Sequence, residues 1–366
     1  MARPSWCSPS TSSSTACSWP FEGPSGRTTR PGSWRPSATR EKTFSVSPPD
    51  GALFPEGPLL AFVGPTATGK TRLAVEAALL LGGEIVSCDS MAVYKGFDIG
   101  TDKPSPAERR GVPHHLIDVA EPGSFYSAGS FRADALKALL DIWSRGRTAI
   151  LVGGTGLYYR SLTRGLVSAP GRHGEIRERL SRRALARGPE GLHRILSRLD
   201  PDRAREVGPR DTLRIVRALE VRLLTGRPFS RWIRQDPAQK GVTPGLTVGL
   251  TAPKPFLYHR IERRVEEMMA AGLLDEVRRL REAGHLSGPA SKAIGYGELA
   301  SFLEGSLDLE EAVRRIKQRT RNLAKRQQAW FKKEEGIHWF DIQEEEWRDD
   351  ALELIQRWRE KAGAQP

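Results

Sequence analysis

The stretch LLAFVGPTATGKT, residues 59–71, decides which fold the rest of the chain can adopt. Its first five residues are apolar and predict a buried strand, and the next eight match the phosphate-binding pattern G-x-x-x-x-G-K-[ST] at every fixed position. A helix is predicted directly afterwards, so the loop N–H groups and the helix N-terminus converge on one point. Such a site holds an anion of two or more phosphate units. The loop consists of Gly64, Pro65, Thr66, Ala67, Thr68, Gly69, Lys70 and Thr71, and the Thr71 hydroxyl can reach Mg2+.

Strands and helices alternate beyond this loop. Further strands are predicted at 84–90, 148–154 and 246–252. This alternation is typical of an α/β fold: a P-loop core with a central parallel sheet flanked by helices, whose ligands bind at the carboxyl ends of the strands. Asp89, Ser90 and Thr155 follow such strand ends, so we expect them on the rim of the phosphate-binding loop.

An Arg-rich, purely helical region interrupts this alternation. Because a strand is predicted after it, we interpret the region as an all-helical insertion. Farther on, the apolar spacing predicts one amphipathic helix over 258–284 and a basic helix over 309–333. The expected parts are an N-terminal extension (1–57), a first core part (58–171), the insertion (172–240), a second core part with basic helices (241–340) and an acidic C-terminal helix (341–366).

The N-terminal extension is not predicted to be part of the fold. Its first 40 residues are crowded with Ser, Pro and Arg, contain one acidic residue, Glu22, and lack apolar periodicity. Such a segment buries too little surface to offset its ordering entropy. We expect it to be disordered or to result from a misplaced start codon; an organellar targeting segment is the alternative.

Positive charge is gathered in two segments. The net charge is +13; residues 171–235 carry 17 Arg against 8 acidic residues, and residues 312–333 carry 9 Arg and Lys with no acid. This distribution indicates a polyanionic partner larger than the ligand of the loop, and nucleic acid is the first candidate for that partner. The alternative is a generic compositional use of Arg.

The cysteine positions and the hydropathy of the sequence indicate the type of cellular compartment and whether a membrane span is expected. Cys7, Cys17 and Cys88 form neither a disulfide framework nor a zinc-binding spacing, which fits a reducing compartment such as the cytoplasm. The sequence has no apolar run of about 18 residues, so no membrane span is expected. We expect a cytoplasmic monomer.

The rim residues limit the chemistry. Motor and switch NTPases end a second strand with an Asp that helps to hold Mg2+, whereas the segment ILVGGT here contains no acid. Asp89 is instead placed to take a proton from a nucleophile that approaches the phosphorylated ligand. Two hypotheses follow: a small-molecule or nucleoside kinase that uses ATP, and a transferase whose donor carries its own diphosphate leaving group. The second also explains the basic segments, as contacts to a nucleic-acid acceptor.

Eight motifs in register resemble the tRNA dimethylallyltransferase (tRNA isopentenyltransferase) family. They are GPTATGKT, SCDSMAVYKGFDIGTDKP, HHLIDV, ILVGGTGLYYRSL, DTLRIVRALEV, TGRPFS, KAIGYGEL and RNLAKRQQAWFKK, from about Pro58 to Lys333. The resemblance does not cover the N-terminal extension. Beyond Lys333 the chain lacks the Cys and His spacing of the eukaryotic zinc finger, so the bacterial type is closer.

The resemblance implies transfer of a dimethylallyl group from dimethylallyl diphosphate, with Mg2+, to the exocyclic N6 amine of the adenosine immediately 3′ of the anticodon. The loop then holds the diphosphate, Asp89 matches the general base and Thr155 the threonine beside the reacting amine. Arg177 aligns with an arginine of the donor channel, and Arg264 with a residue that contacts the diphosphate. The stretches that align with contacts to the anticodon stem-loop of tRNA are Asp89, Ser90, Met91 and Ala92; Leu213, Arg214, Ile215, Val216 and Arg217; Lys292, Ala293, Ile294, Gly295, Tyr296, Gly297 and Glu298; and Arg319, Thr320, Arg321, Asn322, Leu323, Ala324, Lys325 and Arg326.

Overall fold

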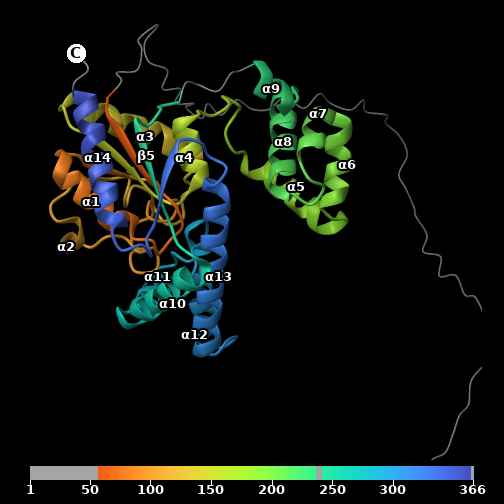
Figure 1. The fold of residues 1–366 in the computed structure, drawn as a ribbon. Helices are drawn as coiled ribbons and strands as arrows, with labels where there is room; N and C mark the ends of the chain where they lie inside the picture. Colours follow the sequence, from red (N-terminus) through yellow and green to blue (C-terminus); the bar gives the residue numbers. More distant parts are fainter. Residues whose placement is uncertain (1–56, 236–240, 364–366) are drawn as a thin grey trace, which may run out of the picture. The chain divides into compact units, whose positions relative to one another are not determined.

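The computed structural model describes residues 57–235 and 241–363, which are drawn as a ribbon in Figure 1. The prediction for the N-terminal extension falls, up to residue 56, outside the described residues. The last five residues of the predicted insertion, 236–240, also lie outside them.

A six-stranded parallel sheet forms the core, in the order β3-β2-β4-β1-β5-β6. The loop-bearing strand β1 lies inside the sheet, pairing with β4 through Leu59 and Ala149 and with β5 through Leu60 and Leu246. The predicted parallel sheet is therefore confirmed. Its strands are β1 (Leu59–Val63), β2 (Glu84–Ser87), β3 (His114–His115), β4 (Ala149–Val152), β5 (Leu246–Thr251) and β6 (Ile337–Asp341).

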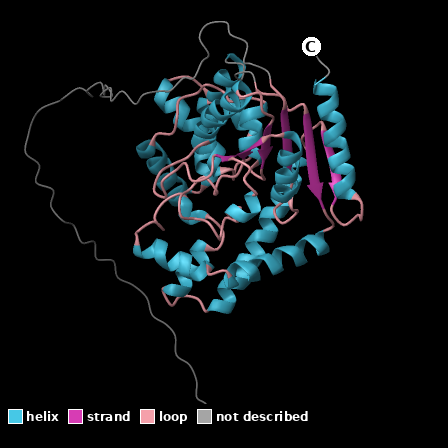
Figure 2. Cartoon of the chain, turned by 90° about the vertical axis from the view of Figure 1, so that its left-hand side faces the viewer, coloured by secondary structure: helices cyan, strands magenta, loops and turns pink. Residues whose placement is uncertain are grey.

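Helices cover both faces of this sheet (Figures 1 and 2). Side chains alternate along β1, so Leu60 and Phe62 pack on one face while Leu59 and Ala61 pack on the other. All five residues of β1 are buried, as expected for a strand covered on both sides. The first face is covered by α1 (Lys70–Leu81), α10 (Lys254–Ala270) and α14 (Trp347–Gly363), and the second by α3 (Ala128–Ser144) and α4 (Gly156–Thr163).

Three features differ from the sequence prediction, and one of them is the two-residue edge strand β3, which was not predicted. The single amphipathic helix expected over 258–284 is wrong, because the chain breaks at Gly272 (φ 96°) between α10 and α11 (Leu273–Glu282). Glycine adopts this left-handed conformation without the steric cost that a Cβ brings, and it ends one apolar stripe and starts another. Strand β6 was not predicted; it is a short edge strand in which His338 and Trp339 are exposed, so it lacks the apolar run of the inner strands.

Over its described residues, 172–235, the Arg-rich region folds into five helices with an apolar core of their own. Leu192, Leu196, Ile215 and Leu219 are nearly inaccessible to solvent at its centre. The insertion helices are α5 (Gly174–Arg187), α6 (Pro189–Leu199), α7 (Pro201–Glu206), α8 (Thr212–Thr225) and α9 (Phe229–Gln235).

The remaining elements connect the core strands. The long basic helix predicted at 309–333 is observed as α13 (Leu309–Phe331), and α2 (Pro106–Arg109) and α12 (Tyr296–Leu303) are shorter. In the part of the chain that the structure describes, none of the helices combines the length and hydropathy that a membrane crossing requires.

Candidate active site

The phosphate-binding loop joins β1 to α1 at the carboxyl edge of the sheet. Gly64 has φ 130°, and a Cβ there would lie 2.3 Å from the carbonyl oxygen of Leu250, so only glycine fits. Gly69 has φ 88° and precedes the first turn of α1. The Thr68 hydroxyl donates to the carbonyl of Pro65 at 2.9 Å and fixes the turn of the loop. The loop is thus shaped as an anion cradle at a helix N-terminus.

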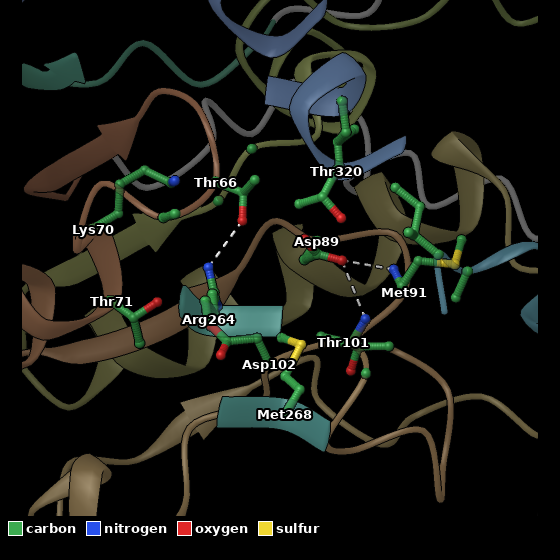
Figure 3. Close-up of a pocket in the computed structure, with 18 of the residues that line it drawn as sticks. Thr66, Lys70, Thr71, Asp89, Met91, Thr101, Asp102, Arg264, Met268 and Thr320 are labelled. Carbon is green, nitrogen blue, oxygen red and sulfur yellow. Dashed lines mark hydrogen bonds and ion pairs between the residues drawn. The ribbon is translucent and has the colours of Figure 1, made fainter. Parts of the chain in front are cut away.

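Two cationic side chains lie beside this loop: Lys70 is buried and Arg264 is half-buried. The Lys70 ammonium donates to the carbonyl of Pro65 rather than to a carboxylate. Burial and, to a smaller extent, the positive charge of Arg264 together lower the pKa of Lys70 to about 7, although the charge of Asp89 acts in the opposite direction. Burial also lowers the pKa of Arg264, whose Nη1 donates to the Thr66 hydroxyl at 3.0 Å and which forms an ion pair with Asp102. Buried charges need compensation, so this pair is arranged to receive an anion (Figure 3).

A carboxylate lies across the same pocket. Asp89 follows β2, and its Oδ1 accepts hydrogen bonds from the N–H groups of Met91 at 2.7 Å and Ala92 at 3.2 Å (Figure 3). Both bonds fall on one oxygen, so the turn fixes the carboxylate while Oδ2 makes no hydrogen bond within the described residues. Asp89 is therefore placed as an oriented proton acceptor.

Thr155 connects this turn to the neighbouring strand. Because β2 and β4 are paired, the residues that follow them meet at the carboxyl edge of the sheet. The Thr155 hydroxyl oxygen accepts from the N–H of Ser90 at 3.1 Å and donates to the Ser90 hydroxyl at 3.4 Å. Asp89 and Thr155, far apart in sequence, belong to one hydrogen-bonded rim.

These groups line a pocket of about 720 Å³. Its lining combines cationic side chains, such as Lys70, Arg260 and Arg264, with apolar ones, such as Met268 and Ile294. An anionic head with a short apolar tail suits this combination. Among the residues predicted for the site, those that line the pocket are Thr66, Ala67, Gly69, Lys70, Thr71, Asp89, Ser90, Met91, Ala92, Thr155, Arg264, Lys292, Ala293, Ile294, Arg319, Thr320, Asn322, Leu323 and Arg326.

Comparison with known proteins identifies the family to which the chain belongs. The family model described as IPP transferase matches residues 92–334. The chain belongs to this family. It is 49% identical over 284 residues to a tRNA dimethylallyltransferase of Geobacter metallireducens, which covers 77% of this chain and 92% of that protein. It is 44% identical over 302 residues to the enzyme of the same name from Thermomicrobium roseum, covering 82% and 91%.

Solved structures of IPP transferases have the same fold. The tRNA isopentenylpyrophosphate transferase of Bacillus halodurans is similar with a TM-score of 0.61 and 37% identity, covering 84% of this chain and 98% of that one. A eukaryotic dimethylallyltransferase acting on tRNA is similar with a TM-score of 0.68 and 29% identity, covering 78% and 74%. The sheet and the loop described above are thus those of the family.

Arg177, predicted for the donor channel, lies on α5 of the insertion and is not among the pocket-lining residues. Its guanidinium binds the fully buried Glu220 through two bonds of 2.8 and 3.0 Å. Burial alone would raise the pKa of Glu220, but the hydrogen bonds from Arg177, the His173 N–H and Arg217 lower it. The catalytic assignment of Arg177 stays a prediction; the structure shows it as part of this buried ion cluster.

Other predicted tRNA contacts differ in exposure. Leu213 is largely exposed, whereas Ile215, Tyr296 and Ala324 are almost completely buried and pack inside their own clusters. The predicted contacts outside the pocket lining are Leu213, Arg214, Ile215, Val216 and Arg217, Gly295, Tyr296, Gly297 and Glu298, and Arg321, Ala324 and Lys325. These contacts remain predictions. An exposed side chain can contact tRNA directly, whereas a buried one cannot do so without moving.

Among the pocket residues that were not predicted from the sequence, three contact the phosphate-binding loop or Arg264. Arg260 Nε donates to the Ala67 carbonyl at 2.8 Å, Asp102 pairs with Arg264, and Gln327 bonds to Thr66. For Arg260, the spacing of four residues to Arg264 on one helix face was an available signal. Asp102 lies in an irregular loop and has no comparable signal.

Proposed function

We propose that this IPP transferase transfers a dimethylallyl group from dimethylallyl diphosphate to the N6 amine of the adenosine immediately 3′ of the anticodon in tRNA. The observation that carries the proposal is the pair of cations beside the loop, buried Lys70 and half-buried Arg264, with the oriented Asp89 across the same pocket. The names of its relatives support prenyl transfer to tRNA and do not favour a small-molecule or nucleoside kinase. The products are N6-isopentenyladenosine and diphosphate.

The loop side of the pocket supports departure of diphosphate. As the bond between the allylic carbon and oxygen breaks, negative charge grows on the diphosphate oxygens. Backbone N–H groups of the loop, Lys70 and Arg264 stabilise that charge, which is worth several kcal/mol in a site that excludes water. Binding of the anion also supplies a counter-charge to Lys70, which donates to a carbonyl and not to a carboxylate.

Mg2+ fits this arrangement. Within the described residues no group of three or more His, Cys, Asp or Glu side chains could hold a metal, so an ion would be held by the Thr71 hydroxyl and by oxygens of the bound diphosphate. Mg2+ commonly binds in this way, with few protein ligands and substrate phosphates. When bound, it would neutralise further charge on the leaving group.

Asp89 and Thr155 support attack by the amine. The amine nitrogen forms a bond to the allylic carbon and loses a proton, which Asp89 accepts on Oδ2. The Met91 and Ala92 N–H groups hold the other oxygen, so the base does not rotate during the transfer. The adenosine must first leave its stack, at a cost of a few kcal/mol that is smallest in a single-stranded loop such as the anticodon loop.

The basic segments support tRNA binding. On α13, Arg319 and Arg326 line the pocket, and on α5, Arg183 and Arg187 are exposed. We place the segments 213–217 and 292–298 in the same interface and keep Arg177 as a proposed residue of the donor channel. We also propose that the chain acts as a monomer in the cytoplasm. Backbone phosphates would supply most of the affinity and make it fall with salt.

The test is a transfer assay. Purified protein is incubated with Mg2+, dimethylallyl diphosphate labelled in the prenyl group, and tRNA without the modification. Label is expected in the tRNA, at the adenosine 3′ of the anticodon after nuclease digestion. Conversion of ATP to ADP with phosphorylation of a nucleoside acceptor, and no label in tRNA, would instead support a kinase.

A further inference from the structure

Gln327 of helix α13 bridges two loops of the pocket. Its side chain is buried, and its Oε1 accepts a hydrogen bond from the N–H of Thr66 at 2.8 Å. Its Nε2 donates to the carbonyl of Gly154 at 3.1 Å. One amide therefore satisfies both of its ends, once on the phosphate-binding loop and once on the turn that follows β4.

The first end fixes the donor side. Thr66 is held at its N–H by Gln327 and at its hydroxyl by Arg264 Nη1, at 3.0 Å. These two bonds come from α13 and α10, so side chains from two helices set the position of one loop residue. Because the Thr66 N–H donates to Gln327, the orientation of this N–H and of the adjoining loop depends on the glutamine.

The second end fixes the acceptor side. Gly154 precedes Thr155, whose hydroxyl holds the Ser90 N–H next to Asp89. The fit is tight, since a Cβ on Gly154 would lie 2.1 Å from Nε2 of Gln327. The amide of Gln327 thus stands between the groups that hold the leaving group and those that hold the base.

A neighbouring glutamine makes a contact of another kind. Gln328 Nε2 donates to the Thr251 hydroxyl at 3.0 Å, at the end of β5. This bond also attaches α13 to the carboxyl edge of the sheet, but it reaches neither the phosphate-binding loop nor the turn with Thr155. Gln328 therefore offers a matched control on the same helix.

We propose that Gln327 is a positioning residue for the transfer step, which sets the separation between the phosphate-binding loop and the turn that carries Thr155 and Asp89. The inference rests on the proposed function, because it assigns the two sides to donor and acceptor. Transfer requires the reacting atoms to be held in a near-attack geometry, and a displacement of about 1 Å can cost about 100-fold in rate. Gln327 contributes this alignment without touching the reacting atoms.

The first test compares Gln327→Met with Gln328→Met. Methionine keeps the length of the side chain and removes its hydrogen bonds. The single-turnover rate at saturating dimethylallyl diphosphate and tRNA is expected to fall about 10- to 100-fold in Gln327→Met and to stay near the wild-type rate in Gln328→Met. The tRNA dissociation constant should be unchanged in both variants, and their thermal midpoints should be similar. A merely structural role of these glutamines would instead affect both variants alike.

A second test reaches the same contact from the other side. Gly154→Ala places a methyl group where Nε2 of Gln327 lies, and Gly154 has an ordinary φ, so the glutamine must move. Gly154→Ala is expected to slow the single turnover as Gln327→Met does, and the double variant Gly154→Ala with Gln327→Ala should be no slower than Gln327→Ala alone. Such non-additivity is the signature of a shared contact.

Two outcomes would overturn the inference. One is a single-turnover rate within threefold of wild type in folded Gln327→Met or Gly154→Ala. The other is full additivity of the Gly154 and Gln327 substitutions. Absence of prenyl transfer by the wild-type protein in the same assay would refute the proposed function instead, so the two failures are distinguishable.

Discussion

The pocket and the helical insertion both carry dense positive charge, but they hold it in different ways. In the pocket, Lys70 is buried and bonded to a carbonyl, and burial brings its pKa down to about 7. In the insertion, Arg177 and Arg217 share the buried Glu220, whereas Arg183 and Arg187 are exposed on α5. Burial therefore distinguishes a site for one small anion from a surface suited to a long polyanion.

The largest expected effect comes from the base. Asp89→Asn keeps an oxygen for the N–H groups of Met91 and Ala92 but removes the proton acceptor. Single-turnover prenyl transfer is expected to fall roughly 10²- to 10⁴-fold, with little change in tRNA affinity. A rate near that of wild type would show that another group takes the proton.

The second-largest expected effect tests whether the buried cation of the pocket matters more than a cation outside it. Lys70→Met is expected to lower kcat/KM for dimethylallyl diphosphate by about 10²- to 10³-fold, because it removes charge stabilisation where the leaving group departs. Lys137→Met is the control, since Lys137 is exposed on α3, pairs with Asp134 on the same helix and does not line the pocket. Steady-state kinetics at saturating tRNA measure both; equal losses would mean that general charge, and not burial, matters.

The smallest effect on rate belongs to the insertion. The double variant Arg183→Glu and Arg187→Glu should weaken tRNA binding several-fold and reduce the slope of log affinity against log salt by about one for each lost phosphate contact. Affinity for dimethylallyl diphosphate should not change. Arg357→Glu, an exposed reversal on α14, serves as the control. If the control and the double variant behave alike, the charge of the insertion is compositional.

The difference between the two regions also explains what the sequence could predict. The strands β1, β2, β4 and β5 and the pocket position of Asp89 and Thr155 follow from local patterns, because apolar runs and the loop motif are contiguous in sequence. The break at Gly272 and the edge strand β6 were missed, since a glycine within an apolar stripe and a half-exposed strand give weak local signals.

Contacts made by tertiary packing had no local signal. Gln327 meets Thr66 across 261 positions of sequence, and no spacing rule connects them. Arg177 was placed by alignment alone, whereas its observed partner, Glu220, is 43 positions away on another helix of the insertion. Side chains whose role depends on the docking of separate helices require the structure.

The state of Lys70 offers the most direct measurement. The Lys70 pKa is lowered from 10.5 to about 7 without a bound anion, so at pH 8 most molecules carry a neutral amine there. A diphosphate beside it raises the pKa again, and binding must then take up a proton. Near pH 6 the group is already charged, so this uptake disappears.

Proton uptake is measured by titration calorimetry with inorganic diphosphate in buffers of different ionisation enthalpy, for wild type and Lys70→Met. The variant subtracts protons taken up by the diphosphate itself. At pH 8 the wild type is predicted to take up close to one proton more than Lys70→Met, and at pH 6 almost none. Equal uptake by the two proteins at both pH values would contradict the claim that the pocket holds the leaving group with a buried cation awaiting its anion.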